Sequence, residues 1–382
     1  MHRILNYSFR LFATLLIVYG RLYRYFTRQR VAAAQAIAVL PYTPEGWPGG
    51  KDRMAAWKPF FEADAVKFHV LWAWSQEEML AMRNMKKLKQ ARKLYALYYT
   101  ILLRRFRVII SLSQYSAVWV QRAFIPDFPF NSARFERLAA LFNPNICYDF
   151  YDADYVHNRK LVEETASAAA CITVASMHLY HYFSSTNSKT YFLRYAIETE
   201  NFVAQRKHNN TALQIGWMGS PDNALQLLDI ALVLQQLESE FPQIVFSFAC
   251  RAMPDLQLKN MKVQQWGDPG FVYEEWLAGI DIGMVPYLNP TETVKAKIAM
   301  KSLEFMANGI AMVVSPYMHS DKLEHNKSVM IATTTHEWYE MLKQLIVSEE
   351  LRRTMGENAR QVFANYHTYA NTYAELRYIL LP

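Results

Sequence analysis

The feature that most constrains this chain is an alternation of short apolar runs with longer helical patterns, which occurs twice along the sequence. Short apolar runs bounded by Pro, Gly or polar residues are typical of buried strands. In the first half these runs are residues 36–42, 66–72, 116–121, 146–150, 171–175 and 190–196. In the second half they are residues 213–218, 244–249, 263–266, 281–286 and 311–315. Strands that alternate with helices predict parallel sheets with helices on both faces.

Helical patterns fill the spaces between these runs, and a polar stretch at residues 205–211 separates the two halves as a linker. The helices are expected from about Asp52, then at 76–107, 133–142, 159–167, 223–240, 273–278, 297–308, 335–347, 349–366 and at the end of the chain. A length of 382 residues is typical of about two domains. We therefore predict an α/β chain with two doubly wound, Rossmann-type domains at residues 31–205 and 206–365. A basic amphipathic helix at 1–30 precedes them, and a helix at 366–382 is expected to pack back on the first domain.

Composition excludes several classes of protein. Apolar residues make up 52% of the chain and charged residues 20%, so a disordered chain is excluded. The net charge of +7 is weaker than that of a dedicated nucleic-acid binder, and no nucleic-acid partner is expected. Cys147, Cys171 and Cys250 have neither metal-ligand nor paired spacing. They are interpreted as buried thiols in a reducing compartment, and no metal site is predicted.

The N-terminal segment carries an apolar run, residues 11–20, between arginines. The run is shorter than the roughly 20 residues that a membrane span needs. Its basic flanks, which include Arg3, Arg10 and Arg21, and its aromatic neighbours suit a helix that lies in a membrane interface. Two alternatives remain: a helix packed on the body of the protein, and a signal-like segment.

Glycine is scarce and unevenly placed: there are 12 glycines, and none lies between residues 51 and 215. Three glycine-bearing segments follow predicted strands or helices: residues 48–51, residues 216–222 and Gly309. None is a Walker motif and no GxGxxG fingerprint occurs, so P-loop ATPases and dinucleotide oxidoreductases lose support. In an open α/β sheet such turns offer backbone N–H groups to phosphates. An ordinary structural turn is the alternative for each.

Two lysines and a glutamate have helical spacing within residues 297–308. Lys297 and Lys301 are four residues apart, and Glu304 is three further on, so the three would share one face of a helix. Two ammonium groups and a carboxylate could together bind two phosphates and a ribose diol. The alternative is an ordinary solvated face.

The run KAKIAMKSLEFMANGIAMVVSP, residues 295–316, resembles the donor-binding segment of glycosyltransferase family 4, in particular a lysine-rich bacterial branch. Lys295, Lys297, Lys301 and Gly309 are in register with that branch. Other segments resemble the family in the expected order: VWVQRAFIP (118–126), YDFYDAD (148–154), IGWMGSPDN (215–223), DIGMVP (281–286) and EELRRTMGENAR (349–360). The resemblance spans residues 36–366 and implies a GT-B-like fold, with an acceptor-binding domain followed by a nucleotide-sugar donor domain that face a central cleft.

The resemblance also implies roles for individual residues. Glu304 would accept hydrogen bonds from the ribose, and Lys301, Lys297 and Lys295 would bind the diphosphate. Lys301 and Lys297 would stabilise the departing nucleoside diphosphate. Gly49, Gly50, Gly219 and Ser220 would offer donors to the diphosphate. Such enzymes retain the anomeric configuration and need no metal or cofactor.

Two positions depart from the family pattern. Ala296 stands where many members have an acidic residue, which removes one expected sugar contact. Tyr151 replaces the first of two usual aspartates, and Asp152 remains. Asp152 is the candidate for binding sugar hydroxyls as a catalytic-site residue, with a helix-capping aspartate as the alternative.

The resulting hypothesis is a retaining, metal-independent glycosyltransferase that uses a nucleotide-diphosphate sugar. Its acceptor would be a hydroxyl on a lipid-linked saccharide in bacterial surface polysaccharide synthesis, such as capsule, exopolysaccharide or lipopolysaccharide. Its expected location is cytoplasmic, with peripheral contact at the inner face of the cell membrane through residues 1–30. The alternatives are a nucleotide-sugar epimerase of the same fold and a catalytically inactive scaffold of a polysaccharide assembly complex.

Overall fold

A computed structural model describes residues 1–382 except 28–34, 86–89, 126–131, 199–211 and 266–267. The chain forms two compact units. Unit 1 comprises Met1–Tyr195 and Thr372–Pro382, and unit 2 comprises Ala196–Asn371. The predicted linker at 205–211 and the expected boundary between residues 205 and 206 lie outside the described residues.

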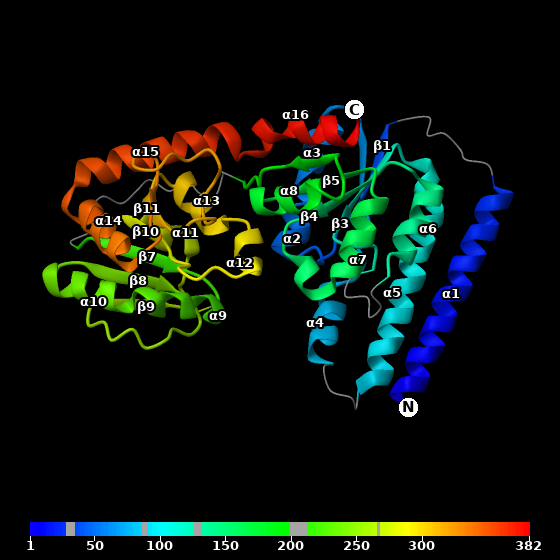
Figure 1. Cartoon of the computed structure of the whole chain (residues 1–382), viewed down its shortest axis with the longest axis horizontal. Helices are drawn as coiled ribbons and strands as arrows, with labels where there is room; N and C mark the ends of the chain where they lie inside the picture. Colours follow the sequence, from blue (N-terminus) through cyan, green and yellow to red (C-terminus); the bar gives the residue numbers. More distant parts are fainter. Residues whose placement is uncertain (28–34, 86–89, 126–131, 199–211, 266–267) are drawn as a thin grey trace. The chain divides into compact units, whose positions relative to one another are not determined.

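Unit 1 contains a parallel six-stranded sheet in the order β2-β1-β3-β4-β5-β6 (Figure 1). Its strands are β1 (Ala36–Leu40), β2 (Lys67–Val70), β3 (Ala117–Gln121), β4 (Ile146–Phe150), β5 (Cys171–Val174) and β6 (Thr190–Phe192). Every residue of β1, β3 and β4 is buried, as expected for central strands of a parallel sheet with both faces covered. All six strands fall within the predicted runs.

Unit 1 also contains the helices that flank this sheet and an N-terminal helix that packs on two of them. They are α1 (His2–Phe26), α2 (Pro48–Lys51), α3 (Lys58–Ala63), α4 (Gln76–Asn84), α5 (Ala91–Ser111), α6 (Arg134–Phe142), α7 (Asp154–Ala168) and α8 (Met177–Ser184), with short 3-10 turns at Ala55–Trp57 and Leu112–Gln114. The single helix predicted at 76–107 is instead two helices, since α4 ends at Asn84 and α5 begins at Ala91. Residues 86–89, which carry three of the lysines of that prediction, lie outside the described residues.

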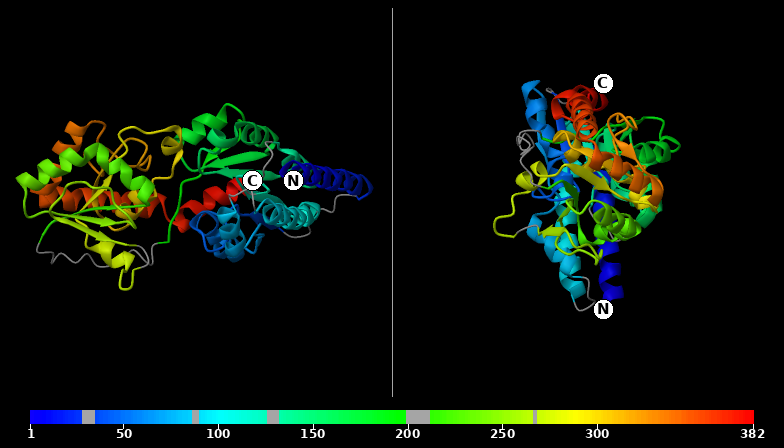
Figure 2. Two further views of the ribbon diagram at one scale, coloured as in Figure 1. Left: turned by 90° about the horizontal axis from the view of Figure 1, so that it is seen from below. Right: turned by 90° about the vertical axis from the view of Figure 1, so that its left-hand side faces the viewer.

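Helix α1 packs along α5 and α6 (Figures 1 and 2). Phe9, Ala13, Ile17 and Gly20 form its buried stripe. A Cβ atom on Gly20 would lie 3.2 Å from the Phe106 ring and 3.3 Å from Leu138, so the glycine permits close approach of the helices. A helix packed on the body of the protein and a helix in a membrane interface are therefore compatible interpretations, because a packed stripe leaves the opposite side of the helix exposed.

Unit 2 contains a second parallel six-stranded sheet, in the order β12-β11-β10-β7-β8-β9. Its strands are β7 (Gln214–Met218), β8 (Val245–Ala249), β9 (Met261–Gln264), β10 (Ile282–Val285), β11 (Ala311–Val314) and β12 (Met330–Ile331). The sequence did not predict β12, whose two residues are too short to give a periodic signal. The predicted α/β class with two doubly wound sheets is confirmed.

The helices of unit 2 are α9 (Pro221–Ala224), α10 (Ala231–Glu240), α11 (Tyr273–Ala278), α12 (Glu292–Ala296), α13 (Met300–Ala307), α14 (Thr335–Val347) and α15 (Glu349–Tyr366), with a 3-10 helix at Leu225–Ile230. Helix α16 (Tyr369–Leu380) begins in unit 2, and from Thr372 onward it belongs to unit 1. The predicted helix at 223–240 is thus three shorter pieces.

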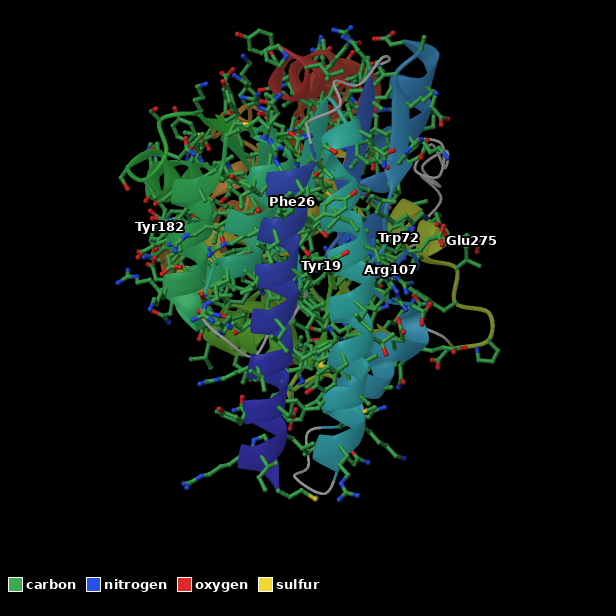
Figure 3. All side chains as sticks on the ribbon, turned by 90° about the vertical axis from the view of Figure 1, so that its right-hand side faces the viewer. Tyr19, Phe26, Trp72, Arg107, Tyr182 and Glu275 are labelled. Atoms are coloured by element: carbon green, nitrogen blue, oxygen red, sulfur yellow. The ribbon has the colours of Figure 1, made fainter. Side chains whose placement is uncertain are left out.

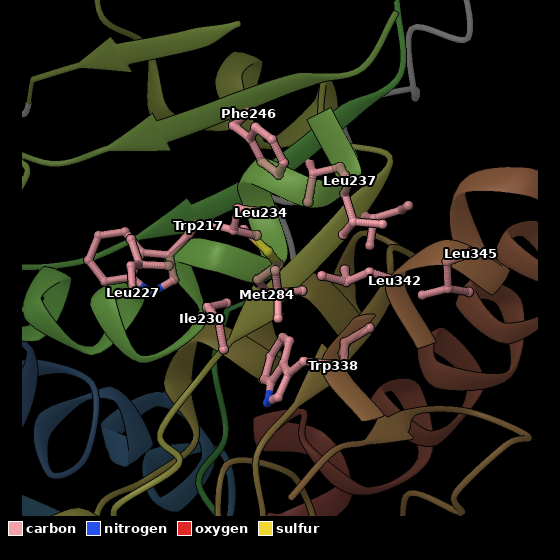
Figure 4. Close-up of a cluster of buried hydrophobic side chains, with 14 of the residues drawn as sticks. Trp217, Leu227, Ile230, Leu234, Leu237, Phe246, Met284, Trp338, Leu342 and Leu345 are labelled. Atoms are coloured by element: carbon pink, nitrogen blue, oxygen red, sulfur yellow. The ribbon is translucent and has the colours of Figure 1, made fainter. Parts of the chain in front are cut away.

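The core of unit 2 joins the sheet to helices from distant parts of the sequence (Figure 4). Trp217 on β7 and Met284 on β10 contribute from the sheet, and Trp338, Leu342 and Leu345 on α14 contribute from one helix layer. Full burial of each large apolar side chain stabilises the fold by about 1.5–3 kcal/mol relative to exposure. This core fixes the strand ends on which the candidate site is built.

Candidate functional site

The carboxyl ends of the central strands of unit 2 carry most of the predicted site residues. Gly219 and Ser220 follow β7, Tyr287 lies just beyond β10, and α13 connects β10 to β11. Ligands of open α/β sheets bind at this edge, because loops and helix N-termini meet there. The local fold therefore brings Lys297, Lys301, Glu304, Gly219 and Ser220 to one edge of one sheet.

Lys301 is the central group of this edge. Its Nζ is buried and has no hydrogen-bond partner among the described residues. The ammonium lies 4.5 Å from the centre of the Trp217 ring and 5.7 Å from that of Tyr287. Burial, and secondarily the charge of Lys297, lower the pKa of Lys301 to about 7, although Glu304 acts in the opposite direction. Two aromatic rings thus lie beside an ammonium group whose Nζ makes no hydrogen bond within the described part of the chain.

Lys297 reaches the same place from a different element. The prediction that Lys297, Lys301 and Glu304 share one helix is wrong, because α13 begins at Met300. Lys297 is instead the extended residue that ends α12, with φ −62° and ψ 150°. Its Nζ donates a hydrogen bond to Oδ1 of Asn223 at 3.2 Å and lies 6.0 Å from the Tyr287 ring centre. The two ammonium groups converge through tertiary structure and not through helical periodicity.

Glu304 lies on α13 one turn beyond Lys301 and is half-buried. Its neighbour is Tyr273, the first residue of α11. Burial raises the pKa of the Tyr273 hydroxyl well above its ordinary value, and the adjacent Glu304 carboxylate raises it further. The Tyr273 hydroxyl also lies against the sulfur of Met218 at the end of β7. The Glu304 carboxylate thus lies near enough to Lys301 to act on the charge of that lysine.

Gly219 and Ser220 form the turn between β7 and α9. The N–H of Gly219 donates to the carbonyl of Ala249 at 3.1 Å. A Cβ atom at Gly219 would lie 2.9 Å from the Trp217 ring and 3.0 Å from Lys301 Nζ, so the glycine leaves space for the lysine. Ser220 is exposed, and its hydroxyl caps α9 by accepting from the N–H of Asn223 at 3.4 Å.

Lys295 and Ala296 precede this cluster on α12. The Nζ of Lys295 forms an ion pair with Glu292 at 2.9 Å one turn away, and this pair raises the pKa of the lysine. Lys295 is therefore not among the groups around Lys301. Ala296 is fully buried. An acidic side chain at that position would have to be buried, so its absence fits the packing of α12.

The two glycines predicted in unit 1 lie in a helix and not in an open loop, since Pro48–Lys51 forms α2. The N–H of Gly50 already donates to the carbonyl of Trp47 at 3.1 Å. The carbonyl of Gly49 accepts from Nε2 of Gln121 at 2.6 Å, and a Cβ atom there would lie 2.6 Å from the Tyr151 hydroxyl. Close packing accounts for both glycines in this unit.

Asp152 follows β4 and forms an ion pair with Arg122, which follows β3. Arg122 also pairs with Asp154 at 3.2 Å and lies over the rings of Tyr151 at 4.6 Å and Tyr42 at 5.0 Å. The side chain of Asp152 is 34% exposed, and the helix α7 that follows has no side-chain cap. The helix-capping alternative thus loses support. Arg122 has φ +62°, a conformation rare for a side-chain-bearing residue.

A cavity of about 330 Å³ adjoins Arg122 in unit 1. One wall is polar, with Arg122, Asp154, His157 and Asn158, and the other is apolar, with residues such as Leu161 and Val162. Asn158 departs from helical geometry within α7, with φ −146° and ψ 64°. The carboxyl edge of the first sheet therefore presents charged groups beside a small cavity.

Several residues of both edges were not selected from the sequence. The segment IGWMGSPDN contains Trp217 and Asn223, and the segment VWVQRAFIP contains Arg122. The family resemblance therefore included these residues without singling them out. Tyr287 directly follows DIGMVP, and Tyr273 lies in no recognised motif. Among the described residues, no group of three or more His, Cys, Asp or Glu side chains could hold a metal ion.

Comparison with solved structures gives matches over nearly the whole chain. A glycosyltransferase from Rickettsia africae ESF-5 has a TM-score of 0.64 and 9% identity, covering 91% of this chain and 98% of that chain. Anabaena Alr3699/HepE in complex with UDP-glucose has a TM-score of 0.61 and 12% identity, covering 90% and 98%. The two units and their sheets match these structures. The chain has the GT-B fold.

The same fold is found in the sucrose-phosphate synthase of Thermosynechococcus elongatus, with a TM-score of 0.60, 11% identity, and coverage of 90% of this chain and 98% of that chain. Residues 231–377 match a family model described as "Glycosyl transferase-like". No curated protein matches the chain. The matched residues of the family model include Lys297, Lys301 and Glu304, so the model covers the central part of the candidate site.

Proposed function

We propose that this GT-B chain is a retaining glycosyltransferase of family 4, in its lysine-rich branch, and that unit 2 binds a nucleotide-diphosphate sugar. The observation that carries the proposal is the buried ammonium of Lys301, which has no acceptor among the described residues. Burying an unpaired cation costs several kcal/mol, so such a group is retained where an anion binds. The match of residues 231–377 to a glycosyl transferase-like family supports a nucleoside diphosphate as that anion.

Each group at this edge has a role in the proposed reaction. Lys301 and Lys297 bind the diphosphate and stabilise the charge that develops when the sugar leaves. Glu304 accepts hydrogen bonds from the ribose hydroxyls. The leaving phosphate helps to deprotonate the acceptor hydroxyl on the same face of the sugar, which gives retention without a protein nucleophile or a metal. Retention is proposed from the resemblance of residues 295–316 to family 4.

The acceptor side of the proposal rests on unit 1. Asp152, held by Arg122, is proposed to bind sugar hydroxyls. Helix α1 supports a lipid-linked saccharide as acceptor, because its outer stripe exposes large apolar side chains that include Ile4, Leu11 and Leu15. Figure 3 shows α1 with Tyr19 and Phe26 along it. No helix among the described residues is long and apolar enough to cross a membrane. We therefore propose peripheral binding to an anionic membrane surface, as expected in bacterial surface polysaccharide synthesis.

The test of donor binding compares three variants. We expect Lys301→Ala to lower the turnover of the donor by roughly 100-fold or more, since it removes a preorganised charge from the leaving group. Glu304→Gln should mainly weaken donor binding. Lys295→Ala is the matched control, because Lys295 is a lysine of the same segment that pairs with Glu292 instead. Its turnover should equal that of the wild type.

The assay follows release of nucleoside diphosphate, after thermal-shift screening has selected the donor. UDP-sugars are screened first, because the Anabaena structure contains UDP-glucose. A bound donor stabilises the folded state and raises the melting temperature by an amount that grows with the logarithm of its concentration over Kd. Wild-type turnover in both Lys301→Ala and Glu304→Gln would show that the donor site lies elsewhere. An absence of any nucleoside diphosphate release with a donor that binds would favour a non-transferring scaffold.

A further inference from the structure

Two cysteines and a lysine are in register with one another on or next to neighbouring strands of unit 1. Cys147 on β4 is the register partner of Cys171 on β5. On the other side of β5, Ile172 is opposite Thr190, and the N–H of Ile172 donates to the carbonyl of Lys189. One residue earlier on each strand, Cys171 is opposite Lys189, so these two residues lie side by side. Register partners in a sheet project from the same face, so the three side chains share one face.

The two thiols have the spacing that a disulfide needs. Both cysteines are free. Neighbouring strands lie about 4.8 Å apart, which falls within the roughly 4.4–6.8 Å between Cα atoms that a disulfide bridges. The sequence predicted buried thiols, and Cys147 is buried, but Cys171 is partly exposed. Cys171 is therefore the more accessible member of the pair, and Cys147 is the buried one.

Cys171 opens into a cavity of about 530 Å³ at the amino ends of the strands. The residues that line it include Cys147, Cys171, Lys189 and Tyr191, and residues 378–382. Asp152 and Arg122 stand beyond the carboxyl ends of β4 and β3, so this cavity is at the opposite edge of the sheet from the acceptor residues. A cavity of this volume can admit a small organic molecule.

The surroundings favour the thiolate of Cys171 over that of Cys147. A hydrogen bond from the Cys147 thiol lowers the pKa of Cys171, and the charge of Lys189 lowers it further. Burial raises the pKa of Cys147. Asp149, which lies on the same face as Cys147 and pairs with Arg53 at 2.7 Å, also raises the pKa of Cys147. The accessible thiol is thus also the more nucleophilic one.

We propose that Cys171 and Cys147 form a dithiol site that reacts with small-molecule disulfides in this cavity. The Cys171 thiolate attacks one sulfur of the small disulfide, forms a mixed disulfide and releases one small thiolate. Cys147 then loses its proton to solvent and attacks the sulfur of Cys171, which releases the second small thiolate and closes the Cys147–Cys171 bond. The protein loses two protons and two electrons, and the small disulfide is reduced to two thiols. Excess reductant reverses the reaction.

In the experiment, the native full chain is treated with dithiobis(nitrobenzoate), an aromatic disulfide whose released thiolate is coloured. Absorbance follows the thiolate release, and mass spectrometry gives the mass of the protein product. The wild type should release two thiolates per chain, retain no adduct and become lighter by two hydrogens. Cys147→Ser should release one thiolate and retain the adduct on Cys171. Cys171→Ser should lose the fast phase. Lys189→Ala, a change at an exposed side chain, should slow the first release by about 3- to 10-fold.

Cys250→Ser is the matched control, because Cys250 is a buried free thiol of unit 2, and it should react as the wild type does. A stable adduct on the native wild type would overturn the role of Cys147. An equally fast release from Cys171→Ser, provided that its melting temperature matches the wild type, would overturn the role of Cys171. An unchanged rate in Lys189→Ala would contradict the assigned environment of Cys171 without reference to any transferase activity.

Discussion

At position 301, the buried ammonium group that is proposed to bind the donor diphosphate also lowers the stability of the free protein. The pKa of Lys301 is lowered from 10.5 to about 7 by burial and by Lys297. Between these two values the folded state holds fewer protons than the unfolded state, so this group makes the protein more stable as the pH rises. Below about pH 7 both states are protonated, and the whole cost of burying the charge is present.

Lys301→Met should therefore stabilise the protein in the absence of donor while it abolishes donor binding. Methionine fills the same space without a charge, and we expect a gain of roughly 1–3 kcal/mol below pH 7 that shrinks as the pH rises toward about 10. The check is the difference in melting temperature between variant and wild type over this pH range. Parallel profiles for the two proteins would mean that Lys301 is not the buried cation described above.

At the scale of elements, glycines determine how closely helices and strands approach one another. This role explains the glycines at positions 283 and 309, which lie in segments that resemble the donor domain of the family. Gly309 ends α13 with φ +62°, and the N–H of Ile310 returns to the carbonyl of Phe305 at 2.9 Å. Gly283 on β10 faces the Phe305 ring, where a Cβ atom would lie 2.5 Å from it. Close packing and backbone conformation thus account for the glycines at positions 283 and 309.

Gly356 on α15 gives the sharpest test of this packing. A Cβ atom there would overlap the carbonyl oxygen of Gly309, so Gly356→Ala would force α15 away from the end of α13. We expect a loss of about 3 kcal/mol or more, within the range of overpacking that also shifts backbone. The control is Gly279→Ala at the end of α11, where an added Cβ atom meets neighbours only at 3.4 Å or more. Thermal unfolding of both variants checks the prediction. Equal melting temperatures for the two variants would contradict it.

At the scale of the whole molecule, periodicity predicted the strands of both sheets that are local apolar runs, and the structure confirms these. The run predicted at 263–266 only overlaps β9 (Met261–Gln264), which is mostly exposed, and β12 was not predicted. Periodicity failed where tertiary packing decides the outcome. The helix expected at 297–308 begins only at Met300, and Lys297 reaches Lys301 from the end of α12. Tyr273 comes to Glu304 through the packing of α11, and the Cys147–Cys171 pair exists only through the strand order. Contacts between residues distant in sequence leave no local pattern, so single-sequence reasoning cannot locate them.

At the same scale, the proposed attachment of α1 to a membrane surface can be tested directly. The outer stripe of α1 includes Leu11 and Leu15, which are 52% and 58% exposed, and arginines lie beside it. Leu11→Glu with Leu15→Glu leaves the buried stripe intact, so the protein should stay folded. Sedimentation with anionic vesicles should weaken by at least about tenfold, because apolar burial is lost and negative charge is added.

A matched pair of leucines separates this effect from a general loss of apolar surface. Leu228 and Leu232 in unit 2 are 47% and 79% exposed, and their replacement by Glu should leave vesicle binding unchanged. Binding of the wild type should also fall with added salt and on neutral vesicles, since arginines such as Arg3, Arg10 and Arg21 contribute only against anionic lipid. If the α1 variant and the unit 2 variant sediment alike with anionic vesicles, the outer stripe of α1 is not a membrane-binding surface, and a lipid-linked acceptor loses its structural support.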